Sequence, residues 1–342
     1  MICPGCLREQ VAEGYCKKCQ RELFGGQKVG HILPFNSPNQ EESDLYTNLT
    51  KKISISGAQV KYSMKLEDGK LVLTEKVGQY ILKPVPSGQF KNLDQAPANE
   101  HLTMQIARQL SKIPAPPNAI IYFNDQNPAY LVKRFDVKQD GTKSQQEDFA
   151  QVAQVTEETH GKNYKYDLSY EELGTLIKKH ISMHKVEVEK FLRLVLFNYI
   201  FSNGDAHVKN FSLIQTDAGD YVLTPAYDLL CTRLHSPGEA DMALSLFQDG
   251  FSDAYNVQGF YTHYDFLLLG KMLGIKDSRV ISIINEFRGD DGDIISLVDR
   301  SFLREDLKTS YKEFYRDKSR RLKMEWDNGE IEMSNTGNDW PE

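Results

Sequence analysis

The stretch that most constrains this 342-residue chain is a polar loop at residues 203–210, with the sequence NGDAHVKN. Ahead of it, apolar residues recur at helical spacing over residues 188–200, which predicts a well-buried helix. Behind it, residues 211–215 and 221–224 flank the turn sequence DAGD and predict a β-hairpin. A buried helix and a hairpin therefore present one polar loop, and a further carboxylate, Asp228, follows the hairpin.

The carboxylates and amide of this region suit phosphoryl transfer. Asp205 and Asn210 are five residues apart, and Asp228 lies eighteen residues beyond Asn210. A kinase catalytic loop sets a base and a metal-binding amide at this spacing, and protein kinases hold a second metal ligand in the relative place of Asp228. Mg²⁺ prefers few carboxylates together with phosphate oxygens and water. Alternatively, Asn-Gly-Asp is common turn chemistry, and a single spacing match can arise by chance.

Four of the five cysteines form one pattern near the N-terminus. Cys3 and Cys6 make one CxxC pair, and Cys16 and Cys19 make a second after a gap of nine residues. Two such pairs place four thiolates for a tetrahedral Zn²⁺, so we expect a structural zinc site with no open position for catalysis. A redox pair or a metal-free turn are the alternatives. The fifth cysteine, Cys231, is expected to be a small core residue.

Composition narrows the class of protein. The net charge of -7 gives no overall basic surface, so we do not expect non-specific DNA binding. No window approaches the roughly 18 apolar residues of a membrane span, and the first residues do not form a signal peptide. The sequence therefore predicts a cytoplasmic protein without a membrane partner, long enough for two lobes.

Several strands and one helix are predicted ahead of the polar loop. A hairpin over residues 53–64 has backbone that could cover phosphates, or it is an ordinary hairpin. Strands at 70–75 and 79–83 follow, and the second ends in Lys83, which either pairs with ATP phosphates or is solvated. In the helix expected at 98–112, Glu100 either favours the helix N-terminus or pairs with Lys83. Its buried face should hold Leu102, Ile106, Leu110 and Ile113.

The remaining elements are mostly helical. Two strands should flank residues 124–128, and helices should cover residues 173–181, 187–202, 263–273 and 278–288. Asp277 or Ser278 is expected to be the N-cap of the last of these. The charged segment 302–324 is expected to be a solvated helix face with clustered cations at Arg316, Lys318, Arg320, Arg321 and Lys323.

In this order, the segments resemble the HipA family of bacterial serine/threonine kinases, which are toxins of HipBA-type toxin–antitoxin modules. Residues 54–61 resemble the family's glycine-poor phosphate loop, and residues 81–84 its ATP-lysine strand. Residues 98–100 resemble the start of its next helix and 132–136 its hinge. Residues 204–211 together with 225–229 resemble its catalytic and metal segments. The resemblance covers about residues 53 to 310.

The resemblance implies roles for individual residues. Asp205 would accept or orient the substrate hydroxyl, Asn210 and Asp228 would hold Mg²⁺, and Lys83 would contact the α- and β-phosphates. The implied ATP-binding residues are Ser56, Gly57, Ala58, Gln59, Lys61, Lys83, Lys133, Phe135, His207, Asn210 and Asp228. Ser54 and Ser56 match the phosphate-loop serines that shorter relatives autophosphorylate, and a phosphoserine beside ATP should repel the nucleotide.

The resemblance also implies an α/β, two-lobed kinase-like fold with an N-terminal zinc knuckle. The expected units are the knuckle at 1–25, an N-terminal lobe at 26–136, a mainly helical C-terminal lobe at 137–326 and a disordered acidic tail at 327–342. Longer family members carry an extra N-terminal subdomain, so we expect a separate small protein to supply it. An antitoxin is the second expected partner, and DNA contact would come only through it.

The implied activity is ATP-dependent phosphorylation of serine or threonine on a protein and on the chain itself, and the implied target class is an aminoacyl-tRNA synthetase. Two alternatives stay open. A small-molecule or lipid phosphotransferase of the same fold would use the 231–262 region for its acceptor. An ATP-binding pseudokinase would have lost turnover, although Lys83, Asp205, Asn210 and Asp228 are all present.

Overall fold

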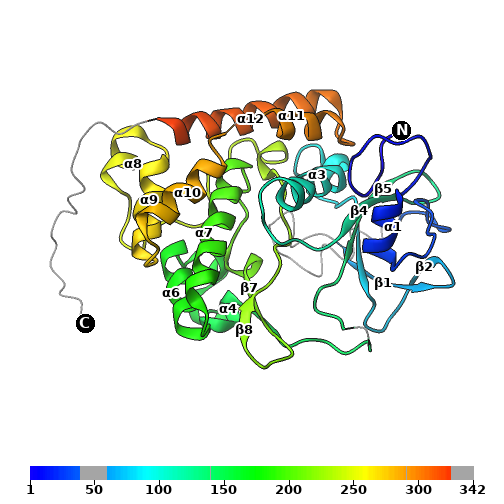
Figure 1. Cartoon of the computed structure of the whole chain (residues 1–342), viewed down its shortest axis with the longest axis horizontal. Helices are drawn as coiled ribbons and strands as arrows, with labels where there is room; N and C mark the ends of the chain where they lie inside the picture. Colours follow the sequence, from blue (N-terminus) through cyan, green and yellow to red (C-terminus); the bar gives the residue numbers. More distant parts are fainter. Residues whose placement is uncertain (39–59, 139, 290, 325–342) are drawn as a thin grey trace.

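The computed structural model describes residues 1–38, 60–138, 140–289 and 291–324 (Figure 1). A five-stranded sheet occupies one end of this part of the chain, and a mainly helical region occupies the other. Most of the predicted hairpin at 53–64 lies outside the described residues, as does the tail at 327–342. So do five predicted functional residues: Ser54, Ser56, Gly57, Ala58 and Gln59.

The larger sheet is antiparallel throughout, in the order β2-β1-β3-β5-β4. Its strands are β1 (Tyr62–Glu67), β2 (Lys70–Leu73), β3 (Tyr80–Pro84), β4 (Asn118–Tyr122) and β5 (Pro128–Lys133). Asp68 and Gly69 both adopt positive φ, as a two-residue hairpin turn between twisted strands requires. The strands predicted at 70–75 and 79–83 are thus confirmed, and Lys83 of β3 lies opposite Tyr130 of β5.

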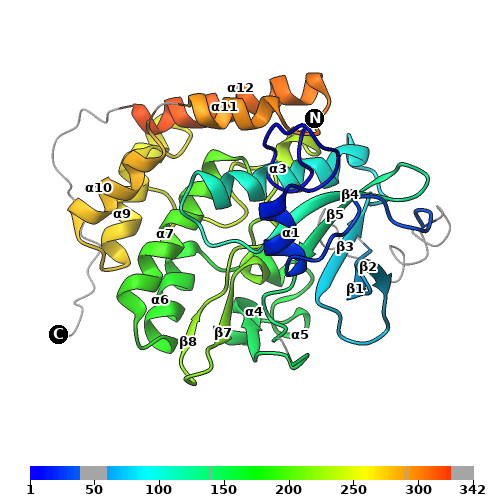
Figure 2. The same cartoon turned by 45° about the vertical axis from the view of Figure 1, so that its right-hand side comes forward.

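Helix α3 (Ala96–Gln109) lies between this sheet and the helical region (Figure 2). Every residue from 96 to 107 is buried. The predicted helix is therefore confirmed, but its amphipathic pattern understates its burial, because neighbours cover it on several sides. Leu110 was expected on the buried face. It lies beyond the end of α3 and is 37% exposed.

The helical region is built around α7 (His184–Ile200), the buried helix predicted before the polar loop. Beside it lies a three-stranded sheet of β6 (Gln146–Asp148), β7 (Ser212–Gln215) and β8 (Tyr221–Leu223), in which β7 and β8 form the predicted hairpin. The other helices are α4 (Phe149–Val152), α5 (Glu157–His160), α6 (Tyr170–His180), α8 (Asp253–Gln258), α9 (His263–Met272), α10 (Asp277–Glu286), α11 (Gly292–Asp299) and α12 (Glu305–Lys323). No helix of the described ranges has both the length and the apolar character to cross a membrane.

One expectation about the last helices is wrong, and another holds for only some of the residues named. The N-cap of α10 is Lys276, and Asp277 is already helical, so neither Asp277 nor Ser278 caps it. The cations of α12 were expected to be solvated; Arg316, Arg320 and Lys323 are exposed, but the Lys318 side chain is 1% exposed and pairs with Asp241. Its amine also lies 4.5 Å from the centre of the Tyr199 ring. The reason is that α12 packs along α7 and α9, as Figure 1 shows at the top.

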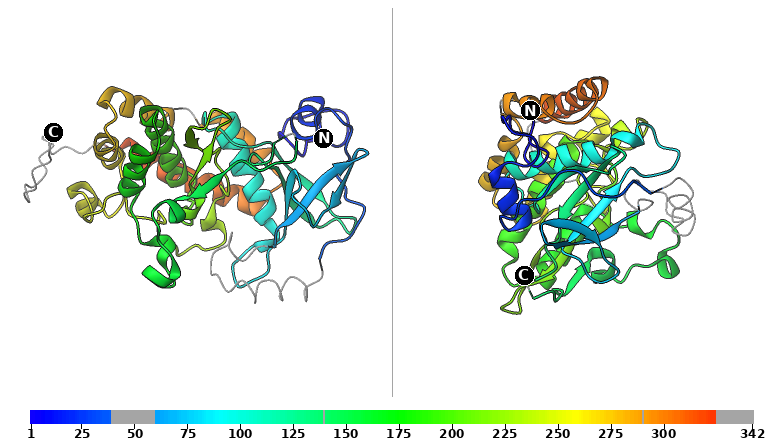
Figure 3. Two further views of the ribbon diagram at one scale, coloured as in Figure 1. Left: turned by 90° about the horizontal axis from the view of Figure 1, so that it is seen from below. Right: turned by 90° about the vertical axis from the view of Figure 1, so that its right-hand side faces the viewer.

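The N-terminal segment packs beside the larger sheet. Helix α1 (Lys17–Phe24) ends at Gly25, whose positive φ suits a helix C-cap. Cys3, Tyr15 and Phe24 share one buried cluster with Met64 of β1 and Leu82 of β3. Figure 3 shows this segment (blue) at the sheet end of the molecule, with α3 (cyan) between the strands and the green helices. The four cysteines are therefore part of the core that supports the sheet.

Candidate active site

A cleft of about 260 Å³ lies where the sheet meets the helical region. The sheet contributes Lys83 and Tyr130, and α3 contributes Glu100. The segment after β8 contributes Tyr227 and Asp228. The cleft thus gathers residues that are far apart in the sequence. Four predicted ATP-binding residues line it besides Asp228, namely Lys61, Lys83, Lys133 and Phe135.

Lys83 is the central charge of this cleft. Its side chain is 4% exposed, and its Nζ lies 2.6 Å from Oε1 of Glu100. The same Nζ contacts Oδ1 of Asp228. Burial lowers the pKa of Lys83, but the Asp228 and Glu100 carboxylates outweigh it and raise the pKa above its ordinary value. Of the two readings of Glu100, its pairing with Lys83 is confirmed, and the lysine is charged at neutral pH.

Asp228 is held in an unusual backbone conformation. Its φ is 54°, in the left-handed region that non-glycine residues rarely adopt. Such a conformation typically costs about 1–3 kcal/mol and tends to persist where the surroundings fix it. Oδ2 of Asp228 lies 3.8 Å from the Nζ of Lys61. Burial raises the pKa of Asp228, but Lys61 and Lys83 outweigh it and hold the pKa well below its usual range. The carboxylate is therefore ionised and faces the cleft.

The polar loop after α7 orders Asp205 and Asn210 through short contacts. Oδ1 of Asn210 accepts a 3.1 Å hydrogen bond from the backbone N–H of His207. This bond closes the turn from His207 to Asn210. The Tyr166 hydroxyl donates a 2.8 Å hydrogen bond to Oδ1 of Asp205. No motif in the sequence indicated Tyr166, because it reaches the loop from 39 residues away.

His207 packs inside this loop. Its side chain is 6% exposed, and its ring meets Tyr166 edge-on at 5.4 Å between centroids. Burial, helped by the charge of Lys165, lowers the pKa of His207 to about 3. The imidazole is therefore neutral at pH 7. It can donate a hydrogen bond but brings no positive charge to a phosphate.

The predicted hinge residues lie at the end of β5. Phe135 stacks on Tyr227 with 6.0 Å between ring centroids. The backbone N–H of Lys133 donates to the carbonyl of Pro117 at 2.9 Å, and its Nζ points to the carbonyl of Glu22. The resemblance implies that the main chain near Lys133 and Phe135 would bind adenine; such a contact would use groups other than the N–H of Lys133.

A second network behind the loop was not predicted. The backbone N–H of Gly204 donates to the Thr232 hydroxyl at 2.7 Å, and Thr232 also contacts Glu239. Burial raises the pKa of Glu239 to about 7, and the nearby Asp205 charge adds to this. This network fixes the start of the polar loop. No motif indicated this network, because a threonine and a glutamate in a loop match no known pattern.

Asp228 and Asn210 offer donor types that fit Mg²⁺, although only Asp228 lines the cleft, whereas Asn210 lines a second pocket. A carboxylate and an amide oxygen, from Asp228 and Asn210, are hard oxygen ligands that leave positions for phosphate oxygens and water.

The four cysteines fit Zn²⁺ in a different way. Their sulfurs all lie within 4.8 Å of one another, with 3.8 Å between Cys3 and Cys19 and 3.7 Å between Cys6 and Cys16. A tetrahedron with Zn–S bonds of about 2.3 Å has edges of about 3.8 Å.

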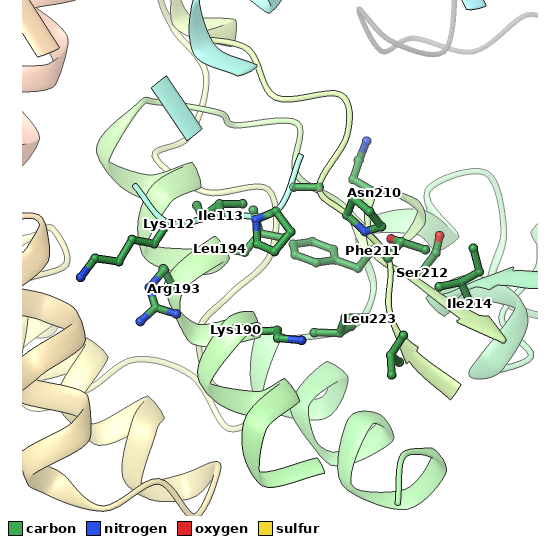
Figure 4. A pocket seen from close by; sticks show the side chains of 15 residues that line it. Lys112, Ile113, Lys190, Arg193, Leu194, Asn210, Phe211, Ser212, Ile214 and Leu223 are labelled. Atoms are coloured by element: carbon green, nitrogen blue, oxygen red, sulfur yellow. The ribbon is translucent and has the colours of Figure 1, made fainter. Parts of the chain in front are cut away.

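A slightly larger pocket, of about 280 Å³, lies behind the β7–β8 hairpin (Figure 4). Ile113, Leu194, Phe211 and Leu223 form apolar walls, and the pocket does not include Lys83 or Asp228. Three cations also line it, and each has a carboxylate partner. Lys112 and Arg193 pair with Glu286, and Lys190 pairs with Glu187. This pocket therefore suits phosphates less well than the cleft around Lys83.

A family model and relatives of known sequence match large parts of this chain. The model of the HipA-like C-terminal domain matches residues 53–290. A Haemophilus influenzae protein named "Putative kinase" is 26% identical over 313 residues, which cover 86% of this chain and 89% of that protein. "Putative kinase Y4dM" of Sinorhizobium fredii is 32% identical over 270 residues, which cover 70% of this chain and 63% of that protein.

Two solved structures share the fold. One is HipA in the Shewanella oneidensis MR-1 complex of HipA, HipB and operator DNA, with a TM-score of 0.62 and 21% identity over 85% of this chain and 73% of that one. The other is the Helicobacter pylori proinflammatory kinase CtkA, with a TM-score of 0.51 and 14% identity over 76% of this chain and 90% of that one. The predicted kinase-like fold is confirmed. Because the family model spans more than half of the chain, this protein belongs to the HipA-like C-terminal domain family.

Proposed function

We propose that this protein is an ATP-dependent serine/threonine protein kinase. The observation that carries the proposal is the buried amine of Lys83, which lies between Glu100 and Asp228 in the cleft. A charged lysine fixed by a helix carboxylate and facing a metal-type aspartate is the arrangement that protein kinases use for ATP phosphates. The kinase names of the relatives support the same class of reaction.

In the proposed reaction, the acceptor hydroxyl oxygen attacks the γ-phosphorus, and the bond from that phosphorus to the bridging oxygen breaks, which releases ADP. Asp205 accepts the hydroxyl proton, while Tyr166 holds its carboxylate in place. Lys83 neutralises charge on the α- and β-phosphates. Bound Mg²⁺, held by Asn210 and Asp228, would neutralise phosphate charge. Positioning and charge neutralisation supply most of the catalysis in this reaction class.

The proposal extends to partners and cellular role. The HipA neighbour was solved together with HipB and operator DNA, so we propose an antitoxin partner here and DNA contact only through it. A small protein resembling the extra N-terminal subdomain of longer relatives is a second proposed partner. The proposed target class is an aminoacyl-tRNA synthetase. Ser54 and Ser56 are proposed autophosphorylation sites that switch off nucleotide binding.

Phosphosite mapping with Mg²⁺ and ATP tests this function. Wild type should gain phosphate on Ser54 or Ser56, whereas Asp205→Ala should gain none and still bind ATP. Asp217→Ala is the matched control, because it removes a carboxylate that is 87% exposed at the hairpin tip. If wild type binds ATP and phosphorylates neither itself nor any protein acceptor, the proposal is wrong. Turnover with small hydroxyl compounds would then support the small-molecule kinase, and no turnover the pseudokinase.

A further inference from the structure

The four-cysteine segment is joined to helix α3 and strand β4 by three successive backbone carbonyls. The carbonyl of Pro4 accepts a 2.9 Å hydrogen bond from the N–H of Ile120 in β4. The carbonyl of Gly5 accepts 3.0 Å from Nε2 of His101, and that of Cys6 accepts 3.0 Å from Nε2 of Gln109. The loop between the first two cysteines therefore holds α3 at its middle, through His101, and at its C-terminal end, through Gln109.

The shape of this loop depends on the sulfur cluster. Cys3 and Cys6 enclose Pro4 and Gly5, and a Cβ added to Gly5 would lie 2.6 Å from the sulfur of Cys19. The backbone N–H of Cys16 donates to the sulfur of Cys3 at 3.2 Å. Any separation of the four sulfurs would consequently move the carbonyls that bond to α3.

The second CxxC pair adds contacts to the same helix. Cys19 lies in α1, and Glu22 of that helix pairs with Arg108 of α3 at 2.7 Å. The Tyr15 hydroxyl, just ahead of Cys16, donates 2.9 Å to the carbonyl of Ile120. Both halves of the four-cysteine segment thus contact the elements that flank the cleft. Among the described residues that line the cleft, none comes from residues 1–25.

His101 and Glu100 connect this segment to the nucleotide cleft. They are adjacent in α3, so their side chains leave the helix about 100° apart. His101 is fully buried and bonds to Gly5, whereas Glu100 pairs with Lys83. A turn or shift of α3 that broke the first contact would also change the second.

We propose that a bound zinc ion at Cys3, Cys6, Cys16 and Cys19 fixes the position of α3, and that His101 is the positioning residue that transmits this to the Lys83–Glu100 pair. A four-thiolate site in this geometry suits a borderline-soft divalent cation such as Zn²⁺. The inference rests on the proposed function for its link to ATP. Its test, however, does not require phosphate transfer.

The test compares zinc-loaded full-length protein with chelator-treated protein and with two His101 variants. Zinc stoichiometry is measured by elemental mass spectrometry, and the position of α3 by hydrogen–deuterium exchange over residues 96–109. Mg²⁺-ATP affinity is measured by calorimetry. His101→Leu removes the hydrogen bond to Gly5, while His101→Gln keeps an N–H donor. His160→Leu, at an exposed histidine of α5, is the matched control.

We expect His101→Leu to retain one zinc ion, to exchange faster in α3 and to bind ATP about tenfold more weakly, the effect typical of one lost buried hydrogen bond. His101→Gln should recover most of this, and zinc removal should reproduce the His101→Leu result. The inference is overturned if the protein binds no zinc. It is equally overturned if folded His101→Leu exchanges in α3 and binds ATP like wild type. Faster α3 exchange without phosphate transfer would support the coupling while contradicting the proposed kinase activity.

Discussion

Replacement of Lys83 by methionine should strongly destabilise the folded protein, because it leaves one buried carboxylate without a cation. The Glu100 side chain is 5% exposed, and Lys83 is its ion-pair partner. Asp228 is 14% exposed and keeps Lys61 at 3.8 Å. Only Glu100 therefore loses its ion-pair partner. Removing one member of a buried ion pair costs about 3–5 kcal/mol, and we expect a loss in free energy of unfolding within that range at pH 7.5.

This loss should depend on pH. Burial already raises the pKa of Glu100, and Lys83 is the main influence that lowers it. In the variant, the pKa of Glu100 in the folded protein should rise further above its unfolded value of about 4.3. For a carboxyl with a raised folded-state pKa, the contribution to stability is present below the unfolded pKa and is lost as pH rises through the folded pKa. The variant should therefore be closest to wild type at low pH.

Urea unfolding at pH 5.5 and pH 7.5 measures both effects. Lys61→Met is the control, because Lys61 is 39% exposed and its pairing should contribute less than about 1 kcal/mol. Combining Lys83→Met with Glu100→Gln removes the isolated charge, and should recover about 1–3 kcal/mol of the loss. The reasoning fails if Lys83→Met is as stable as wild type at both pH values, or if the double variant is less stable than the single one.

Three other substitutions give independent results. Tyr166→Phe removes the hydrogen bond to Asp205 and should lower kcat about tenfold in steady-state kinetics without changing ATP affinity. The pKa of Glu239 is raised to about 7, so the stability that this carboxyl contributes at low pH is lost as pH rises through 7. In Glu239→Gln, the midpoint temperature of thermal unfolding should therefore vary less between pH 5 and pH 8 than in wild type. Lys318→Met leaves Asp241 paired with Arg321, so the free energy of unfolding measured in urea should change by only about 1 kcal/mol.

The sequence predicted elements whose partners are close in the chain better than contacts between distant segments. The hairpin of β7 and β8 and the buried helix α7 follow from local patterns and are confirmed. The pairing of Lys83 with Glu100 was one of two alternatives, because a helix carboxylate can also act locally. Lys318 shows where prediction from local patterns fails. A run of cations predicts a solvated face, but its neighbours Asp241 and Tyr199 are more than 70 residues away.

Helix α3 shows why polar spacing can mislead. Its polar residues indicated a helix with one solvated face, yet four of them are fully buried. Each finds a partner in a different segment, so the pattern reflects pairing and not exposure. The pairs are Asn99 with Cys231 at 2.9 Å, His101 with Gly5 at 3.0 Å, Thr103 with Tyr311 at 3.0 Å and Gln105 with Asn118 at 2.8 Å. Because a buried polar group without a partner costs about 1–3 kcal/mol, these contacts hold α3 to the segment after Asp228, the cysteine loop, α12 and β4. The helix that carries Glu100 is therefore held by four segments, of which the cysteine loop is one.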